Sequence, residues 1–204
     1  MEATDWNERY SGGNVPGWDQ GRASPLVLRL LPNIHHPPAR VLVPGCGLGH
    51  EARALDSRGY HVTACDIAPL AIARARSENG VEAILADFLT ADFSDAGLGT
   101  FDLICENALF CAIDPARRDA YVAAAARALR PGGKLFGAFM DFDNATIKRP
   151  GPPYGTSAAD LLHRFHPYFE VQRLEPSAFG FHAAGGGANA PANLPQLEAV
   201  FVRR

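Results

Sequence analysis

Short apolar runs alternate with helix-forming stretches along almost the whole of this 204-residue chain. The expected strands are residues 40–44, 61–66, 82–87, 101–105, 134–140, 169–174 and 197–202. The stretches with helical spacing of apolar residues are 50–58, 70–79, 115–130 and 157–166. Strands that alternate with helices of this length pair in parallel through right-handed crossovers. The sequence therefore predicts an α/β fold with a seven-stranded, mostly parallel, doubly wound sheet.

The last two expected strands are joined differently from the others. Residues 175–196 contain Gly185–Gly187 and three prolines but no helical pattern. This favours a hairpin-like connection and an antiparallel C-terminal strand. Because neither a repeat nor a linker divides the chain, residues 1–204 are expected to form a single domain.

The charge of the chain excludes some classes of partner. A formal net charge of −3 gives no basic face for nucleic acid. No apolar run approaches the about 20 residues of a membrane span, and the acidic N-terminus does not resemble a signal peptide. We expect a cytoplasmic protein that acts on a small molecule, binds neither nucleic acid nor membrane, and is a monomer or weak dimer.

The four cysteines are Cys46, Cys65, Cys105 and Cys111. They form no Cys-x-x-Cys pair and no His/Cys cluster with the spacing of a zinc site. Most lie in or beside apolar runs, where cysteine behaves as a small hydrophobic residue. We expect reduced, non-catalytic thiols and no bound metal.

Polar groups follow the first four expected strands. In an open α/β sheet, ligands bind outside the carboxyl ends of the strands. The candidates are the glycine loop Gly45–Gly49, Asp66, the pair Asp87 and Phe88, and Asn107. The loop's N–H groups suit a carboxylate or phosphate, Asp66 suits ribose hydroxyls, and Asp87 beside Phe88 suits adenine. Together they predict a nucleoside ligand.

Each of these features also has a purely structural interpretation. The glycine loop can be a tight strand-to-helix turn, and Asp66 can cap the helix that opens at Pro69. Asp87 can belong to a strand-end turn. The combination favours the ligand.

Two ligand classes fit such a site. A dinucleotide fold has Gly-x-Gly-x-x-Gly, whereas this chain has Gly45-x-Gly47-x-Gly49 with His50 at the third dinucleotide position. An antiparallel ending also argues against a second mononucleotide-binding half. The nicotinamide interpretation is therefore the weaker of the two.

Further motifs lie in residues 41–51, 62–72, 86–88, 106–115 and 151–154, in the opening segment 6–19, and in the segment Leu129–Gly133. These segments resemble the thiopurine S-methyltransferase superfamily, which includes thiol, halide and thiocyanate methyltransferases. The Leu129–Gly133 segment is typical of methyltransferases. The resemblance implies a Rossmann-like class I methyltransferase fold with S-adenosylmethionine as cofactor and S-adenosylhomocysteine as product. It spans roughly residues 5 to 160.

The resemblance also implies roles for individual residues. Trp6, Tyr10 and Trp18 would cover the cofactor, as part of an N-terminal lid over residues 1–22. Gly45 would touch the amino-acid moiety, Asp66 the ribose, and Asn107 the region near the methionine part. Asp87 and Phe88 would contact the adenine. The full expected set of cofactor-binding residues is Trp6, Tyr10, Trp18, Gly45, Cys46, Gly47, Asp66, Ile67, Asp87, Phe88 and Asn107.

This sequence departs from the family pattern at two of these positions. Tyr10 stands where halide and thiol members often have Trp, and Asn107 stands where many have Tyr. The segment before Trp18 is also one residue longer. The departures bear on the acceptor more than on the cofactor.

Catalytic candidates on the acceptor side are Tyr154, Asn107 and Asp141. Two prolines precede Tyr154 and restrict the backbone before it. Its hydroxyl could orient an acceptor, or its ring could equally have only a packing role in the loop after the fifth expected strand. His182 could be an acid–base group or a solvated loop histidine, and His163 and His166 share a helix face without forming a metal site.

The function that these features favour is methyl transfer to a small, soft nucleophile, above all a thiol sulfur. Halide, thiocyanate or selenium are neighbouring acceptors. The alternatives are an O- or N-methyltransferase of a small metabolite, an NAD-dependent oxidoreductase, and a non-catalytic nucleoside-binding module.

Overall fold

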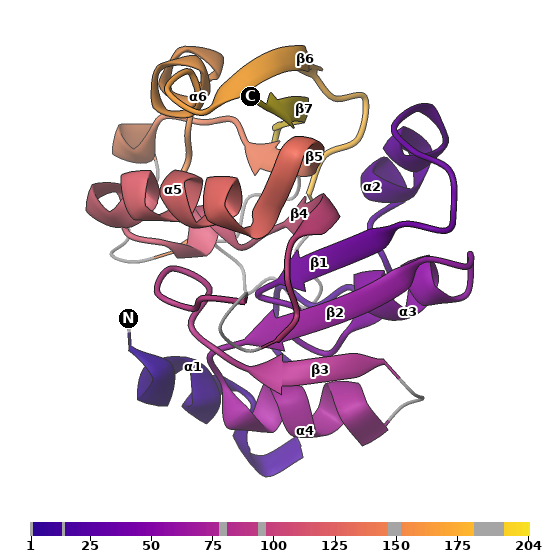
Figure 1. Cartoon of the computed structure of the whole chain (residues 1–204). Coiled ribbons are helices and arrows are strands. Elements are labelled where there is room, and N and C mark those ends of the chain that lie inside the picture. Colours follow the sequence, from indigo (N-terminus) through magenta and orange to yellow (C-terminus); the bar gives the residue numbers. More distant parts are fainter. Residues whose placement is uncertain (1, 14, 78–80, 94–96, 147–151, 182–193) are drawn as a thin grey trace.

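The structure is a computed structural model that describes residues 2–13, 15–77, 81–93, 97–146, 152–181 and 194–204. It contains one seven-stranded sheet with the strand order β3-β2-β1-β4-β5-β7-β6 (Figure 1). The strands are β1 (Arg40–Pro44), β2 (His61–Asp66), β3 (Glu82–Leu85), β4 (Phe101–Asn107), β5 (Leu129–Met140), β6 (Phe169–Pro176) and β7 (Gln196–Arg203). The predicted fold class is confirmed.

Parallel pairing joins the first five strands, and β7 is antiparallel to both β5 and β6. The antiparallel ending predicted for the last two strands is therefore confirmed. The connection between them falls mostly on residues 182–193, which lie outside the described residues.

Only β1 and β2 have the predicted bounds; β4, β6 and β7 are one to two residues longer at one or both ends, and β3 and β5 also differ. The strand expected over 82–87 ends at Leu85, and the one expected to begin at Lys134 already begins at Leu129. In β5, Leu129 pairs with Phe101 before the register shifts, and Gly132 takes a φ of 75° at that irregularity. Glycine adopts this conformation at little cost, so the Pro131–Gly133 segment bends the strand instead of ending it.

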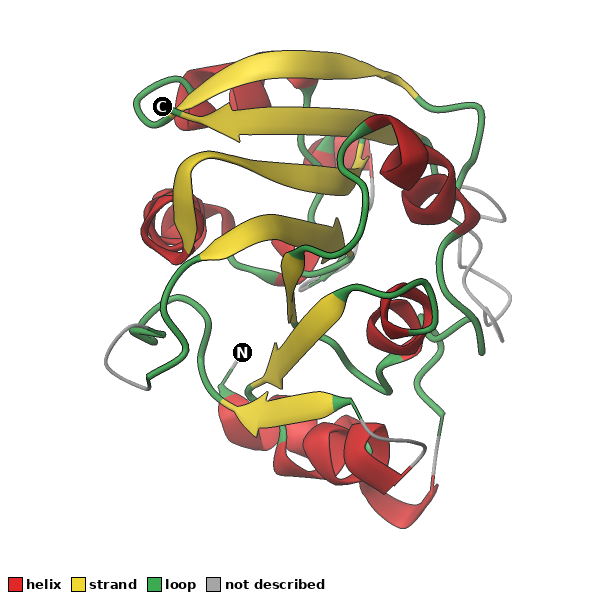
Figure 2. Cartoon of the chain, turned by 45° about the vertical axis from the view of Figure 1, so that its right-hand side comes forward, coloured by secondary structure: helices red, strands yellow, loops and turns green. Residues whose placement is uncertain are grey.

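Helices cover both faces of the sheet (Figure 2). One apolar core packs α2 (Pro25–Leu30), α3 (His50–Asp56) and α4 (Pro69–Ser77) on one face. A second core, rich in phenylalanine, packs α5 (Arg118–Ala128) and α6 (Ala158–Phe165) on the other. The helix expected over 115–130 divides into a 3-10 turn at Pro115–Arg117 followed by α5.

The N-terminal region contains two helices that the apolar pattern does not indicate. They are α1 (Ala3–Arg9), which packs against α4, and α2, whose Leu26, Val27 and Leu30 are buried against the sheet. Both are short, at seven and six residues, so neither carries enough helical periods to stand out in the sequence. Their tertiary contacts stabilise them.

The sheet brings the ends of β1 to β4 to one edge. Pro44 pairs with Cys65, Asp66 with Leu85, and Asn107 with Ala138. Because β1 to β4 run in parallel, the segments that follow them emerge on the same side of the molecule. The candidate site lies at this edge.

Candidate functional site

A pocket of about 360 Å³ opens at the carboxyl ends of β1 to β4. Its size falls in the usual range for small-molecule sites. All eleven residues expected to bind a cofactor line it. They are Trp6, Tyr10, Trp18, Gly45, Cys46, Gly47, Asp66, Ile67, Asp87, Phe88 and Asn107.

Three residues of the glycine loop between β1 and α3 adopt the left-handed backbone conformation. Gly45, Gly47 and Gly49 have φ values of 61°, 52° and 81°. A Cβ on Gly45 would meet Leu109 Cδ1 at 2.9 Å, and one on Gly47 would meet the Tyr10 hydroxyl at 3.2 Å. Glycine at these two positions therefore provides backbone conformation and clearance beside the pocket.

The loop does not form the anion-binding cradle that its N–H groups suggest in the sequence. Cys46 N donates to Cys65 O at 3.0 Å, Gly47 N to Asp66 Oδ2 at 2.9 Å, and Gly49 N to Cys46 O at 2.8 Å. These three donors are already satisfied within the protein. Burial raises the pKa of the Cys46 thiol, which keeps this side chain neutral as well.

Asp66 makes the contact at the start of α4 that its sequence position allows, and it also bonds to the glycine loop. Its Oδ1 accepts a hydrogen bond from Ala68 N at 2.9 Å, just before α4, and its Oδ2 accepts from Gly47 N. Burial raises its pKa, while the backbone donors oppose that shift. A carboxylate offers about four lone-pair sites, so Asp66 retains acceptors for ligand hydroxyls while it fixes the loop.

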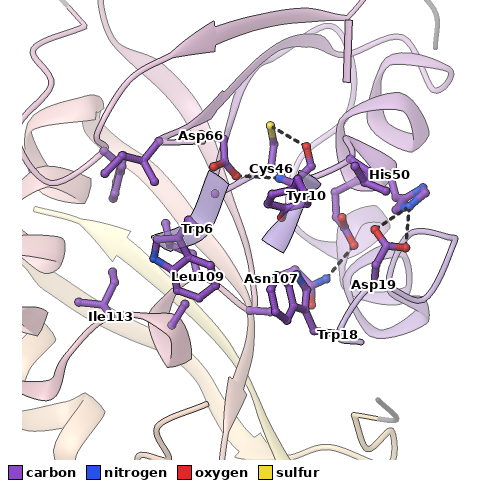
Figure 3. A pocket seen from close by; sticks show the side chains of 18 of the residues that line it. Trp6, Tyr10, Trp18, Asp19, Cys46, His50, Asp66, Asn107, Leu109 and Ile113 are labelled. Atoms are coloured by element: carbon purple, nitrogen blue, oxygen red, sulfur yellow. Dashed lines mark hydrogen bonds and ion pairs between the residues drawn. The ribbon is translucent and has the colours of Figure 1, made fainter. Parts of the chain in front are cut away.

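Three aromatic side chains from the N-terminal region line the pocket (Figure 3). Trp18 makes edge contacts with Trp6, at 5.6 Å between ring centroids, and with Tyr10, at 6.2 Å. Arg74 donates to Tyr10 O and Leu70 N donates to Asn7 Oδ1, which fixes the segment on α4. The rings thus form a packed wall over the glycine loop and the end of β2.

A polar contact holds the other end of this wall. Asp19, next to Trp18, accepts a hydrogen bond from His50 Nε2 at 3.1 Å (Figure 3). His50 Nδ1 lies 3.0 Å from Arg53 Nη2, which donates to it, so Nε2 carries the proton. Neither Asp19 nor His50 is predicted as a site residue from the sequence, because their pairing depends on the fold.

Asp87 and Phe88 lie at the opposite end of the pocket, after β3. Asp87 Oδ1 accepts from Leu89 N at 3.0 Å, and Oδ2 lies 3.8 Å from Arg117 Nη2. Phe88 is mostly buried and packs edge-on against Tyr121 at 5.3 Å. Leu109 and Ile113 add apolar walls near this end, so it offers a carboxylate beside a flat apolar surface.

Asn107, the last residue of β4, donates from Nδ2 to Glu51 Oε1 at 2.8 Å. The same oxygen accepts from Ser24 N at 2.9 Å. Glu51 lines the pocket but is not among the residues predicted from the sequence. Its position could have indicated a role in the site, because it is the second residue of α3 and lies close to the glycine loop in the sequence.

A buried carboxyl group holds the loop that follows Asn107. Glu106 Oε1 accepts from Leu109 N and Phe110 N, both at 2.9 Å, and Oε2 accepts from the Tyr121 hydroxyl at 2.6 Å. Burial raises the pKa of Glu106 to about 7. Ala108, the residue between Asn107 and Leu109, has a φ of 68°, which is a strained conformation for a residue with a side chain. Glu106 thereby stabilises a strained turn that lines the pocket.

Two of the three catalytic candidates lie outside this pocket. Tyr154 is not among the described residues that line it; its backbone N donates to Cys111 O at 2.7 Å and its carbonyl accepts from Arg118. Asp141 lines a separate surface hollow with Arg118 and Asp160. Both residues follow β5, which β4 separates from β1 in the sheet. Asn107 alone of the three reaches the pocket.

Two of the histidines considered in the sequence, His163 and His166, do not line the pocket. His163 and His166 are exposed near the end of α6. His182 lies outside the described residues.

The charges of the pocket lining are unbalanced. Six carboxylate side chains and two guanidinium groups face it: Glu2, Asp19, Glu51, Asp66, Asp87 and Asp114 against Arg22 and Arg117. An acidic pocket favours a cationic ligand over one with several phosphates. With the N–H groups of Cys46, Gly47 and Gly49 also bonded within the protein, the loop offers few donors for a dinucleotide pyrophosphate.

Other kinds of site are not indicated in the described part of the chain. None of its groups of His, Cys, Asp and Glu is arranged to hold a metal ion. None of its helices combines the length and hydrophobicity needed to cross a membrane. The four cysteines are buried free thiols, and burial raises the pKa of each, to about 12 for Cys111.

Comparison with known proteins gives one family match. The family described as Thiopurine S-methyltransferase (TPMT) matches residues 1–190. The chain is 32% identical to "Probable thiol methyltransferase 2" of Arabidopsis thaliana, over 76% of this chain and 68% of that protein. It is 36% identical to "Thiocyanate methyltransferase 1" of Brassica oleracea, over the same shares.

Among solved structures, the fold is similar to that of 1,6-didemethyltoxoflavin-N1-methyltransferase of Burkholderia thailandensis, which has S-adenosylhomocysteine bound. The TM-score is 0.72 at 19% sequence identity, and the match covers 98% of this chain and 86% of the other. This likeness supports the fold assignment.

Proposed function

Since the chain belongs to the thiopurine S-methyltransferase family and is therefore an S-adenosylmethionine-dependent methyltransferase, we propose that its acceptor is the sulfur of a small thiol. The observation that carries the proposal is the acidic, aromatic-walled pocket at the carboxyl ends of β1 to β4. Relatives named for thiol and thiocyanate substrates support a soft acceptor.

The pocket residues fit S-adenosylmethionine. The sulfonium of this cofactor is attracted both by the carboxylates of the lining and by aromatic faces, a cation–π interaction of about 1–2 kcal/mol when desolvated. Trp6, Tyr10 and Trp18 provide such rings. In this proposal Asp66 accepts the ribose hydroxyls, Asp87 and Phe88 contact the adenine, and Ile67 packs beside it.

The remaining expected residues hold the amino-acid end. Gly45, Cys46 and Gly47 let the backbone approach the ligand closely, and Asn107 is held in place by Glu51. The bound cofactor supplies an electrophilic methyl group. The protein contributes position: it aligns the acceptor with the methyl group and excludes water, the main sources of acceleration in such transfers.

The aromatic wall and the strained turn at Ala108 give this alignment its rigidity. Trp18 is fixed by its neighbours and, through Asp19, by His50. Ala108 and Phe181 line the pocket as apolar groups. A thiolate acceptor needs no base at the moment of transfer, because its proton has already left; a free thiol, with a pKa near 8.5, has lost that proton only in part at neutral pH.

Halides, thiocyanate and selenols are neighbouring acceptors within the same proposal, and an oxygen or nitrogen acceptor on a small metabolite is the alternative. A nicotinamide oxidoreductase is disfavoured by the acidic lining and the occupied loop N–H groups. A non-catalytic binding module would keep the cofactor contacts but lack transfer. We further propose that the reaction takes place in the cytoplasm, on a small molecule.

A direct test is transfer of a labelled methyl group from S-adenosylmethionine to a panel of alkyl and aryl thiols, iodide, thiocyanate and phenols. The expected result is labelling of thiols, with loss of most activity in Asp66→Ala and none in Glu170→Gln, an exposed substitution on β6. Labelling of phenols alone would contradict the sulfur assignment. Cofactor binding without any labelled product would favour the binding module.

A further inference from the structure

The carboxylate of Glu51 lies at the end of the pocket between the glycine loop and Asn107. Two donors bond to it, Ser24 N at 2.9 Å and Asn107 Nδ2 at 2.8 Å. Both bonds go to Oε1, and the backbone N–H of Glu51 itself also bonds to the carboxyl group. A carboxylate has about four lone-pair sites, so Glu51 retains an acceptor for a further donor.

Glu51 is the carboxylate of this lining that bonds to Asn107 beside the glycine loop. The other five carboxylates also have partners in the backbone or in a basic side chain: Glu2 in the cap of α1, Asp19 with His50, Asp66 with two backbone N–H groups, Asp87 with Leu89 N and Arg117, and Asp114 with Ala116 N. Burial raises the pKa of Glu51, and a cation at Oε2 would favour its charged form.

A basic side chain lines the same end. Arg22 faces the pocket, and in the described part of the chain no acidic side chain lies within ion-pair distance of it. The bond from Ser24 N to Glu51 fixes residues 22–24 against α3. Arg22 and His50 also line the neighbouring surface hollow together, which places Arg22 beside the start of that helix.

These two side chains carry the charges that complement an amino-acid zwitterion. We propose that Glu51 Oε2 accepts a hydrogen bond from the α-ammonium of S-adenosylmethionine and that Arg22 binds its α-carboxylate. This inference rests on the proposed function and assigns the recognition of the amino-acid end to two residues. Charge-assisted hydrogen bonds of this kind are the stronger ones in proteins.

The assignment also explains how the end of the pocket tolerates a carboxylate ligand. The N–H groups of Cys46, Gly47 and Gly49 are bonded within the protein, so they are not available to it. Arg22 supplies the missing positive charge.

Three ligands distinguish the contact of Glu51 with the ammonium from the contact of Arg22 with the carboxylate. S-adenosylhomocysteine carries both the ammonium and the carboxylate, decarboxylated S-adenosylmethionine carries the ammonium alone, and 5′-deoxy-5′-methylthioadenosine carries neither. Their dissociation constants are measured by calorimetry with the wild type, Glu51→Gln and Arg22→Gln. The matched controls are Glu170→Gln and Arg204→Gln, both at exposed positions. Gln at position 51 retains an oxygen for Ser24 and Asn107.

We expect Glu51→Gln to weaken S-adenosylhomocysteine and the decarboxylated ligand by about tenfold to a hundredfold, and methylthioadenosine by less than about twofold. Arg22→Gln should weaken S-adenosylhomocysteine alone. Equal loss for all three ligands would overturn the inference, because it would mean general damage to the pocket. Unchanged affinities in both variants would overturn it while leaving the proposed function intact. Failure of the wild type to bind any of the three would overturn both.

Discussion

His50 Nε2 lies 3.1 Å from both carboxylate oxygens of Asp19 and donates its hydrogen bond to them. The contact joins the start of α3, directly after the glycine loop, to the segment that carries Trp18. Gly21 N donates to the same carboxylate at 2.7 Å, which closes a tight turn after Trp18. The pair of Asp19 and His50 thus connects the glycine loop to the aromatic wall.

Breaking that pair should loosen the wall. Asp19→Ala removes the acceptor, and we expect S-adenosylhomocysteine affinity to fall about tenfold. The combined fluorescence of Trp6 and Trp18, which pack against each other, should become more accessible to a soluble quencher. Asp56→Ala, an exposed substitution at the end of α3, is the control. Unchanged affinity and quenching would show that Trp18 is held by its ring contacts alone.

Glu106 should make the stability of the protein depend on pH. Its pKa is raised to about 7 in the folded chain from an ordinary value of 4.5, because it is buried. Between these values the folded state holds more protons than the unfolded state, so rising pH removes stability. The contribution is complete below about pH 4.5 and is lost as pH rises through about 7, an amount of about 3 kcal/mol.

Denaturant unfolding of wild type and Glu106→Gln at pH 5, 6, 7 and 8 measures this contribution. As pH rises, the free energy of unfolding of the wild type should fall relative to that of Glu106→Gln, since glutamine does not titrate. Other carboxyl groups with raised pKa are present in both proteins and cancel. A difference independent of pH would contradict the assignment.

Gly137→Ala should strongly destabilise the fold. A Cβ at this position of β5 would lie 2.0 Å from the backbone oxygen of Glu106, on the paired strand β4. Overpacking against backbone costs about 3 kcal/mol or more, and for a chain of this size that lowers Tm by about 6–12 °C. A Tm within about 2 °C of the wild type, roughly the effect of less than 1 kcal/mol, would contradict the strand packing.

Tyr154→Phe and Asn107→Ala distinguish the catalytic candidates. Because Tyr154 is absent from the described pocket lining and its backbone carries its contacts, we expect Tyr154→Phe to keep most of the methyl-transfer rate. Asn107→Ala, which also removes a partner of Glu51, should lower it about tenfold. A large loss of kcat in Tyr154→Phe would restore the role that the sequence suggests for this hydroxyl.

The sequence predicts the order and type of the main elements because their signals are local. β1 and β2 have the expected bounds, and Ser157 caps α6 as a helix start of this kind should. The strand-end positions of Asp66, Asp87 and Asn107 follow from parallel pairing alone. This is why the residues expected to bind the cofactor line one pocket.

The rest depends on contacts between distant segments. The pairing of Asp19 with His50 and that of Glu51 with Ser24 and Asn107 bring together residues that no short motif relates. The use of Gly47 N by Asp66, which removes a donor from the glycine loop, has the same origin. The sequence predicts Tyr154 and Asp141 on the acceptor side, whereas Asp141 lines a separate hollow and Tyr154 is not among the described residues that line the pocket.

The central claim is that the ends of β1 to β4 and the N-terminal rings together enclose an adenosyl amino acid. Paired calorimetric titrations of the wild type with S-adenosylhomocysteine and with NAD test it most directly. The account predicts micromolar binding of S-adenosylhomocysteine, on the order of −8 kcal/mol, and no heat of binding from NAD. Micromolar binding of NAD with none of S-adenosylhomocysteine would contradict it.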